Sequence, residues 1–236
     1  MEILVDYNNV LEVDRRRGIV YLVEKLLGTI GPSRFGSRSR ASIRLYDGWY
    51  ELQSLTRTAQ ETSADVQANS PRTVQLQSQG TSKTLIVNVE LAYSLMSDPT
   101  VHLWHTFRPK NPQSNITCRQ PHEAVCAVVA CPLAPMSAFL STRTCPESSC
   151  NLKPADFVVR NEQKLVDTMI ASDLFALHLA SAPEAVIVSS DDDLLPAIRM
   201  LVKCGTSVIH VLTRPPSFSM DLYLHGLDDK YVQLQL

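Results

Sequence analysis

The sequence predicts a three-layer α/β fold with a mostly parallel central sheet and a cysteine-containing insertion. Short apolar runs of strand length alternate with segments whose apolar residues recur at helical spacing, which is typical of a parallel sheet covered by helices. Residues 108–156 interrupt this alternation, because they hold five of the six cysteines and show little periodicity. We therefore expect one domain made of 1–111 and 155–236, with 112–154 inserted into it.

The first part of the chain is expected to begin the sheet. Residues 2–6 (EILVD) form a short apolar run that ends on an acid, which predicts a buried strand. Apolar residues at helical spacing predict a helix over 19–27, and a strand is predicted over 42–46. Residues 53–83 are rich in Gln, Ser and Thr, and we expect a helix there followed by a flexible loop.

The remaining segments continue the alternation of strands and helices. Strands are predicted over 84–89 and 101–107, with a helix between them that runs through Leu95. After the insertion, a long apolar stripe predicts a helix over 162–180. The sequence after this helix predicts a strand over 185–189, a helix over 194–203 and a strand over 207–212. The final YVQLQL is expected to form an edge strand.

Composition and charge bound the class of protein. Hydrophobic residues make up 44% and charged residues 19% of the 236 residues, as in ordinary globular proteins. No apolar run is long enough to span a membrane, and the first residues lack the basic region of a signal peptide, so we expect a cytoplasmic protein. The net charge of −2 is not the basic excess of a typical nucleic-acid binder. Arg15, Arg16 and Arg17 run together, and composition favours a solvated face over phosphate contact.

Several enzyme classes lack their motifs. The sequence contains no Walker loop, no GxGxxG and no GxSxG, which leaves nucleotide-phosphate, dinucleotide and serine-hydrolase chemistry without support. The six histidines form no pattern typical of a metal site or a catalytic triad. We expect His102, His105 and His178 to be structural.

Acids follow or begin the predicted elements at three places. Asp6 ends the strand over 2–6, and Asp191 and Asp193 follow the strand over 185–189. Asp167 lies early in the helix predicted over 162–180. Ligands of open α/β sheets bind beyond the carboxyl ends of the strands, so these acids are expected to meet if the two strands are neighbours. Each acid alone has a simpler explanation as a helix cap, and the prediction depends on all of them occurring together.

Clustered carboxylates need a counter-charge. Carboxylates within a few ångströms repel one another and raise one another's pKa. Mg²⁺ or Mn²⁺ relieves this repulsion, because hard cations prefer carboxylate oxygens. Such an ion also activates water and stabilises charge on a phosphoryl oxygen. The acids therefore indicate metal-dependent hydrolysis.

The segment LVDYNNVL at 4–11 resembles the opening strand of the NYN family of PIN-like metal-dependent nucleases. In that family an Asp follows an apolar strand and an Asn lies three residues later, a pattern that Asp6 and Asn9 match. Asn8 instead fits the shorter Asp-x-Asn form of PIN domains in general, so the sequence leaves the choice of Asn open.

Two later segments resemble further motifs of the same family. KLVDTMIASDL resembles its Lys-Gly-Val-Asp helix, although Leu165 stands in place of the usual Gly. VSSDDDLLPAIRML resembles its Ser-Gly-Asp-x-Asp-Phe-x-Pro segment, although Ser190 replaces Gly and Leu194 replaces Phe. The matching residues are Lys164, Val166, Asp167, Asp173, Ser189, Asp191, Asp193 and Pro196.

The resemblance implies a metal-dependent endonuclease that hydrolyses phosphodiester bonds, usually in RNA. The implied Mg²⁺ or Mn²⁺ ligands are Asp6, Asp167, Asp191 and Asp193. It also implies that Asn9 orients Asp6 or a water, and that Ser189 supplies a supporting hydrogen bond. Asn8 and Asp173 are further candidates for supporting the ligands. Asp173 falls within an apolar stripe, where it needs a partner, and pairing with a basic residue is the alternative.

The inserted segment contains two Cys-x₄-Cys pairs: Cys126 with Cys131, and Cys145 with Cys150. This spacing, together with few apolar residues, predicts a structural zinc site that replaces a hydrophobic core. A strand with buried free thiols is the equal alternative, and Cys118 and His122 are spare ligands. The arrangement resembles that of some NYN-type proteins, which carry a zinc-binding insertion with paired cysteines just before the Lys-x-Val-Asp helix. We expect the sixth cysteine, Cys204, to lie in the core.

Two classes of function remain. The complete set of acids favours a nuclease that binds RNA. The modest charge favours a catalytically inactive module with the same fold, which binds nucleic acid, a protein partner or a second copy of itself. A phosphatase that uses Asp6 as nucleophile requires an Asp two residues later, and Asn8 stands there.

Overall fold

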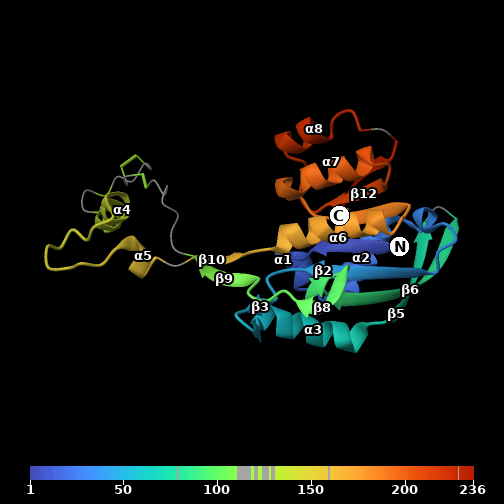
Figure 1. Ribbon diagram of the computed structural model, residues 1–236, viewed down its shortest axis with the longest axis horizontal. Helices are drawn as coiled ribbons and strands as arrows, with labels where there is room; N and C mark the ends of the chain where they lie inside the picture. The colour runs from blue at the N-terminus through green and yellow to red at the C-terminus, as the bar shows by residue number, and fades with distance from the viewer. Residues whose placement is uncertain are drawn as a thin grey trace. The chain divides into compact units, whose positions relative to one another are not determined.

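The computed structural model describes residues 1–236 except 79, 111–117, 120–121, 124–127, 129–130, 159 and 228 (Figure 1). The chain divides into two compact units. Unit 1 comprises Met1–Phe107 and Gln163–Leu236, and unit 2 comprises Arg108–Glu162. The insertion predicted over 112–154 falls inside unit 2, whose bounds are wider.

Unit 1 is a mixed α/β unit built on a seven-stranded sheet with the order β13-β12-β11-β1-β2-β6-β5. Neighbouring strands are parallel, apart from the antiparallel pair β5 and β6. Their bounds are β1 (Glu2–Asp6), β2 (Arg40–Tyr46), β5 (Arg72–Ser78), β6 (Thr81–Leu91), β11 (Glu184–Val188), β12 (Ser207–Leu212) and β13 (Tyr231–Gln235).

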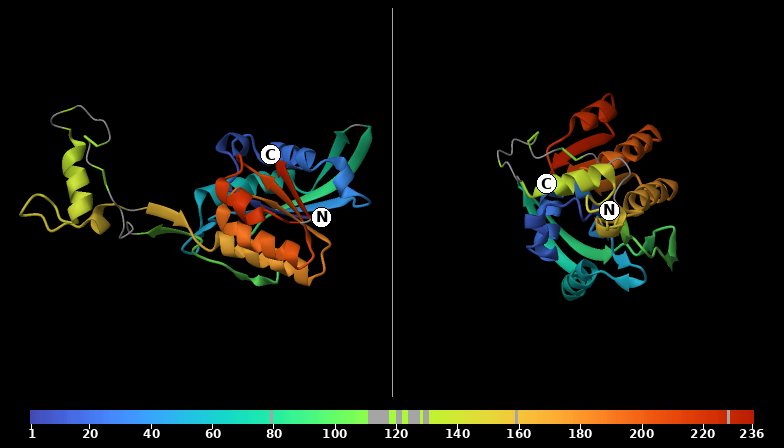
Figure 2. Two further views of the ribbon diagram at one scale, coloured as in Figure 1. Left: turned by 90° about the horizontal axis from the view of Figure 1, so that it is seen from above. Right: turned by 90° about the vertical axis from the view of Figure 1, so that its left-hand side faces the viewer.

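Helices cover both faces of this sheet. The left view of Figure 2 shows α2 (blue) and α6 (orange) on opposite sides of the central strands. The helical elements of unit 1 are α1 (Glu12–Arg15), α2 (Ile19–Ile30), η1 (Pro32–Phe35), α3 (Arg57–Asn69), α6 (Val166–Leu179), η2 (Asp192–Leu194), α7 (Leu195–Lys203) and α8 (Phe218–Leu224). No helix among the described residues is long and apolar enough to cross a membrane.

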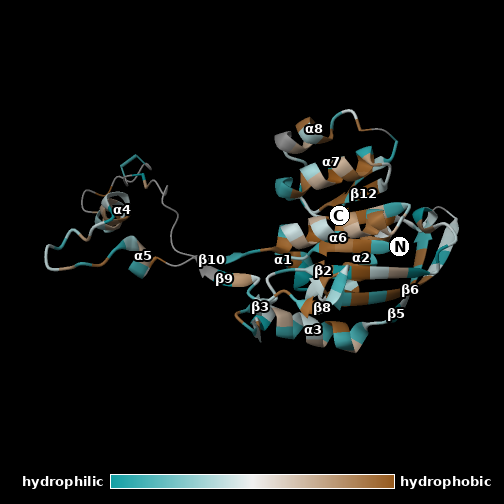
Figure 3. Cartoon of the chain, in the orientation of Figure 1, coloured by the Kyte–Doolittle hydropathy of each residue, from teal (hydrophilic) through white to brown (hydrophobic). Residues whose placement is uncertain are grey.

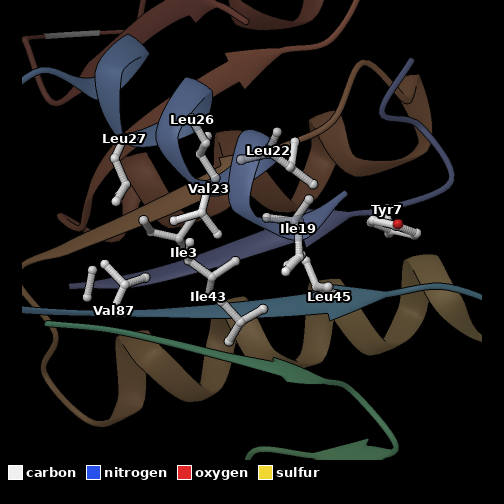
Figure 4. Close-up of a cluster of buried hydrophobic side chains, with 14 of the residues drawn as sticks. Ile3, Tyr7, Ile19, Leu22, Val23, Leu26, Leu27, Ile43, Leu45 and Val87 are labelled. Atoms are coloured by element: carbon white, nitrogen blue, oxygen red, sulfur yellow. The ribbon is translucent and has the colours of Figure 1, made fainter. Parts of the chain in front are cut away.

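Each face of the sheet has its own hydrophobic cluster. On one face, Ile3 and Ile43 pack against residues of α2 such as Val23 (Figure 4). On the other face, Leu4 packs with residues of α6 and α7. Figure 3 shows these apolar stretches along the central strands and α6. Because successive side chains of a strand alternate between faces, β1 places Asp6 on the same face as Leu4, which α6 covers.

Smaller elements complete the chain. In unit 1, β3 (Tyr50–Glu51) pairs with β4 (Ser54–Leu55), and β7 (Ser94–Leu95) pairs with β8 (Asp98–His102). The strands β9 (Phe107–Lys110) and β10 (Arg160–Gln163) contain the two points where the chain passes between units. Unit 2 also contains α4 (Leu133–Thr142) and α5 (Pro154–Phe157).

Most predicted elements of unit 1 are confirmed, with small shifts at their ends. The prediction of a loop after the helix in 53–83 is wrong, because β5 forms there and buries Val74 and Leu76 on alternate positions. The helix before it is α3, which begins after Thr56, whose side chain accepts a hydrogen bond from the Ala59 N–H at 3.2 Å.

Three further expectations differ from the structure. The helix predicted through Leu95 is replaced by the β7–β8 hairpin. The strand predicted over 101–107 is divided, because β8 ends before the positive φ of 64° at His105. The helix predicted over 162–180 begins only at Val166, because Leu165 has a φ of 71°, which lies outside the helical range.

Candidate metal centre

Three acids from distant parts of the chain meet at the carboxyl edge of the sheet. Asp6, Asp167 and Asp191 each offer a carboxylate oxygen, and these atoms lie within 4.8 Å of one another. The convergence follows from the topology, because β1 and β11 are parallel neighbours with Val5 opposite Val188. The predicted adjacency of the two acid-bearing strands is therefore confirmed.

Asp6 is the most buried member of this acid group, with 4% of its surface exposed. The pKa of Asp6 is raised to about 7, chiefly by burial and also by the nearby carboxylates of Asp167 and Asp191. Hydrogen bonds from Ser189 and from the Asn9 backbone oppose this rise. Burial and neighbouring negative charge both disfavour the charged form of a carboxyl group.

Ser189 connects two members of the acid group. Its hydroxyl donates to Oδ2 of Asp6 at 2.9 Å and accepts from the backbone N–H of Asp191 at 3.0 Å. The residue is fully buried, and its carbonyl lies 2.9 Å from Nε2 of His210. Burial lowers the pKa of His210 to about 4, so its ring is neutral near pH 7 and donates to this carbonyl. The predicted supporting hydrogen bond of Ser189 is present.

The segment after β11 supplies Asp191 and Asp193. Asp191 precedes η2, and its Oδ1 accepts a hydrogen bond from the Asp193 N–H at 2.9 Å, so this acid also serves as a helix cap. Asp193 is exposed and lies outside the group of three, although its charge helps to raise the pKa of Asp167. The prediction of four converging ligands therefore changes to three, with Asp193 at the rim, because the tight turn of η2 directs it outward.

Asp167 lies in the first turn of α6. Burial, Asp191 and Asp193 raise its pKa, and Lys164 lowers it. Leu165, which stands where the resembled family has Gly, precedes the helix in a left-handed conformation with φ 71°. That conformation favours glycine, and Leu165 adopts it at a cost on the order of 1 kcal/mol. The helix α6 begins at the next residue, Val166.

Asn9 connects the loop after β1 to the loops after β11 and β12. Its Oδ1 accepts from the Ser190 N–H at 3.0 Å and from the Thr213 hydroxyl at 2.8 Å. Its own N–H lies 3.3 Å from Oδ1 of Asp6. Asn8 is exposed, so Asn9 is the one of the two candidates that contacts Asp6 and the neighbouring loops.

Ser190, which stands where the resembled motif has Gly, connects the loops after β11 and β12. Its hydroxyl oxygen accepts from the backbone N–H groups of Thr213 and Arg214, both at 2.9 Å. Thr213 and His210 are site residues that the sequence analysis missed. The sequence could have indicated them, because His210 lies in the last central strand and Thr213 directly follows it. Neighbouring parallel strands end at the same edge of the sheet.

Asp173 belongs to a different network. It is fully buried and accepts from the Tyr46 hydroxyl at 2.6 Å and the Met96 N–H at 2.7 Å. Nε of Arg44 lies 3.4 Å from the same carboxylate, and Arg44 also contacts Glu90. The predicted supporting role of Asp173 beside the metal ligands is therefore wrong. The structure instead has the alternative, in which Asp173 pairs with a basic residue, Arg44. Asp173 lies six positions after Asp167 in α6, which places it more than one helical turn away.

The predicted zinc site stays a prediction. Cys126 lies outside the described residues, whereas Cys131, Cys145 and Cys150 are half-buried free thiols. The prediction of a core position for Cys204 is wrong, because this thiol is exposed just after the end of α7.

The donor set of the acid group suits a hard divalent cation. All three members offer carboxylate oxygens, the ligand type that Mg²⁺ and Mn²⁺ prefer. Asp167 and Asp191 are half-buried, so solvent molecules have room to complete a coordination shell. Burial and mutual repulsion raise the pKa values of Asp6 and Asp167, and a bound cation would favour their charged forms.

Comparisons with known proteins add no family to this description. No protein-family model, no curated protein and no solved structure matches the chain. The function is therefore argued from the geometry of the acid group.

Proposed function

We propose that this protein is a metal-dependent endonuclease of the PIN-like, NYN type, which uses Mg²⁺ or Mn²⁺ to hydrolyse phosphodiester bonds in RNA. The observation that supports the proposal is the convergence of Asp6, Asp167 and Asp191 within 4.8 Å at the carboxyl edge of a mostly parallel sheet. The choice of RNA rests on the resemblance of the three sequence motifs.

The site residues have separate tasks in this proposal. Asp6, Asp167 and Asp191 bind the cation, and Ser189 fixes the orientation of Asp6 through its 2.9 Å hydrogen bond. Asn9 ties the loops after three neighbouring strands together, so the acids keep their positions when substrate arrives. When bound, the divalent cation offsets the carboxylate charge and supplies Lewis acidity toward water and phosphoryl oxygen.

Two charged side chains border the acid group. Asp193 is exposed beside it, where its carboxylate can accept a proton from the attacking water. Lys164 lies close enough to lower the pKa of Asp167, and its ammonium group contributes positive charge for a phosphate at this edge.

One observation favours a second function. The net charge of −2 is unusual for a protein that grips nucleic acid through phosphates, and among catalytically inactive modules it favours one that binds a protein. In such a module the acid group persists without turnover.

Cleavage assays separate these functions. Labelled single-stranded RNA and DNA are incubated with the protein and Mn²⁺, Mg²⁺ or EDTA, and we expect RNA cleavage with either ion and none with EDTA. Asp191→Asn tests the acid group, and Asp192→Asn is its matched control, because the Asp192 carboxylate instead accepts a hydrogen bond from Ser217. If Asp191→Asn cuts as fast as the wild type, the nuclease proposal fails.

A further inference from the structure

Four aromatic rings gather on the surface of unit 1, and we call them the aromatic platform: Tyr50, Tyr93, His102 and Trp104. Tyr50 is the buried centre, with its ring 4.5 Å from Trp104 and 5.4 Å from Tyr93 between centroids. His102 lies 5.2 Å from Trp104 and nearly parallel to Tyr93. The rings therefore contact one another and form a single cluster.

The outer members of this platform face solvent. Trp104 is 44% exposed, and His102 is exposed as well. The sequence analysis treated His102 as structural, and its contact with the Tyr50 hydroxyl at 3.3 Å agrees with that role. A large aromatic ring that is held in place from behind yet remains exposed is also suited to receive a flat ligand.

A short backbone path joins the platform to the acid group. Thr106, two residues after Trp104, is buried, and its hydroxyl accepts a hydrogen bond from the Tyr50 N–H at 3.0 Å. The Thr106 carbonyl accepts from the Lys164 N–H at 2.8 Å. Lys164 is three residues before Asp167 and close enough to affect its pKa. These two hydrogen bonds connect the segment that carries Trp104 to the residues just before the first turn of α6, which bears Asp167.

The charge of the protein also favours stacking as the means of binding. A chain with a net charge of −2 cannot rely on many phosphate contacts. Stacking of unpaired bases on aromatic rings needs no positive charge and accepts every base. Paired bases are already stacked inside a duplex, so a platform of this kind selects single strands.

We propose that the aromatic platform, through the exposed rings of Trp104 and His102, stacks the unpaired bases of a single-stranded nucleic acid and leads the strand past Lys164 to the acid group. This inference rests on the proposed nuclease function and narrows its substrate to single-stranded segments.

Intrinsic fluorescence tests the stacking directly. The chain has two tryptophans, and Trp49 is 1% exposed, so a bound base can reach Trp104 alone. The protein is Asp191→Asn, without added metal or chelator, so that cleavage does not interfere, and the probe is a twelve-nucleotide oligouridine. We expect the probe to quench tryptophan emission, and Trp104→Phe to remove this response while the emission of Trp49 remains.

Affinity for fluorescein-labelled oligouridine gives an independent measure. Trp104→Ala in the same background is expected to weaken binding by at least about fivefold, the lower end of base–aromatic stacking. Trp104→Phe keeps a ring and should recover part of the affinity. Val101→Ala is the matched control, because Val101 is 54% exposed on β8 but points to the face opposite His102. Melting temperatures establish that each variant is folded.

The possible results distinguish the two proposals. If folded Trp104→Ala binds oligouridine within twofold of its parent and the probe quenches no emission, the platform proposal is overturned, whether or not RNA is cut. If the probe is quenched but no metal ion supports cleavage in the wild type, the nuclease function fails and the platform stands. A duplex of the same oligouridine with oligoadenine should not quench Trp104.

Discussion

The two units of this chain differ in what holds them together. In unit 1, two hydrophobic clusters pack on the two faces of a seven-stranded sheet. Among the described residues of unit 2, no large apolar side chain is buried, and Leu133, Met136 and Leu152 are exposed. A unit with a large core can tolerate several like charges at one edge, whereas a unit without one needs a cross-link or a metal.

This difference separates two uses of a metal ion. In unit 1 the proposed cation site lies at the edge of a sheet with a large hydrophobic core, so we expect an ion there to serve chemistry. In unit 2 the predicted zinc site would substitute for a core, so we expect an ion there to serve folding. The following predictions test that separation.

The largest effect is expected in unit 2. We predict that Cys126, Cys131, Cys145 and Cys150 bind one Zn²⁺, because a structural zinc ion contributes on the order of 10 kcal/mol of binding energy to folding. The double change Cys145→Ser and Cys150→Ser should open unit 2 to proteolysis between Arg108 and Lys153. Fragments of unit 1 should remain associated, because its strands lie outside this range.

Elemental analysis tests the same prediction without a mutation. Protein that has never met a chelator should contain close to one equivalent of zinc, and Cys204→Ser, at an exposed cysteine outside unit 2, should not change this value. A wild-type zinc content below about a tenth of an equivalent would support free thiols instead.

The next effect concerns catalysis. Asp6→Asn should reduce Mn²⁺-dependent RNA cleavage by at least about a thousandfold, which corresponds to roughly 4 kcal/mol in the barrier. The melting temperature without added metal should stay equal or rise, because one of three repelling carboxylates is gone. A variant that loses its fold together with its activity would contradict the idea that the acid group is dispensable for stability.

A third prediction contrasts Asp173 with Asp167 on the same helix. Asp173→Ala should destabilise unit 1 by about 3 kcal/mol, because it removes the partner of a buried guanidinium. Arg44 keeps its contact with Glu90, so we expect the lower end of the usual range. Asp167→Ala should cost little stability. The free energy of unfolding in denaturant measures both, and the opposite ranking would reverse the roles of the two acids.

The smallest effects concern the charge of Asp6. Burial raises its pKa to about 7 in the metal-free protein, so the neutral form stabilises the fold. The stabilisation that the neutral carboxyl group contributes to the fold is fully present when the pH is below 3.8, the ordinary pKa. It is lost as the pH rises through about 7. Mn²⁺ at about a hundred times its dissociation constant should add about 2.7 kcal/mol. Thermal shifts should show a larger gain at pH 8 than at pH 5, and Asp6→Asn should reduce this difference, the remainder coming from Asp167, whose pKa is also raised.

Local sequence patterns were sufficient for the parts of the site that depend on strand ends. Asp6 and Asp191 each follow an apolar run, and parallel pairing alone brings such positions together. The partner of Asp173 was not predictable, because Tyr46 is 127 positions away in the chain. The β7–β8 hairpin was missed because its short strands lack a period that distinguishes them from a helix. The left-handed Leu165 was unpredictable, because tertiary contacts impose a conformation that leucine itself disfavours.

The distance in sequence between the halves of the acid group has a consequence for synthesis. Ser189 and Asp6, which are bonded in the folded protein, are 183 positions apart. At about 5–20 residues per second, roughly 10–40 s pass between the synthesis of the first half of the site and that of the second. During that interval the nascent chain carries Asp6 but has no β11 to pair with β1. If the protein is the nuclease proposed above, it cannot cut the message from which it is being translated before β11 and the segment after it have been made.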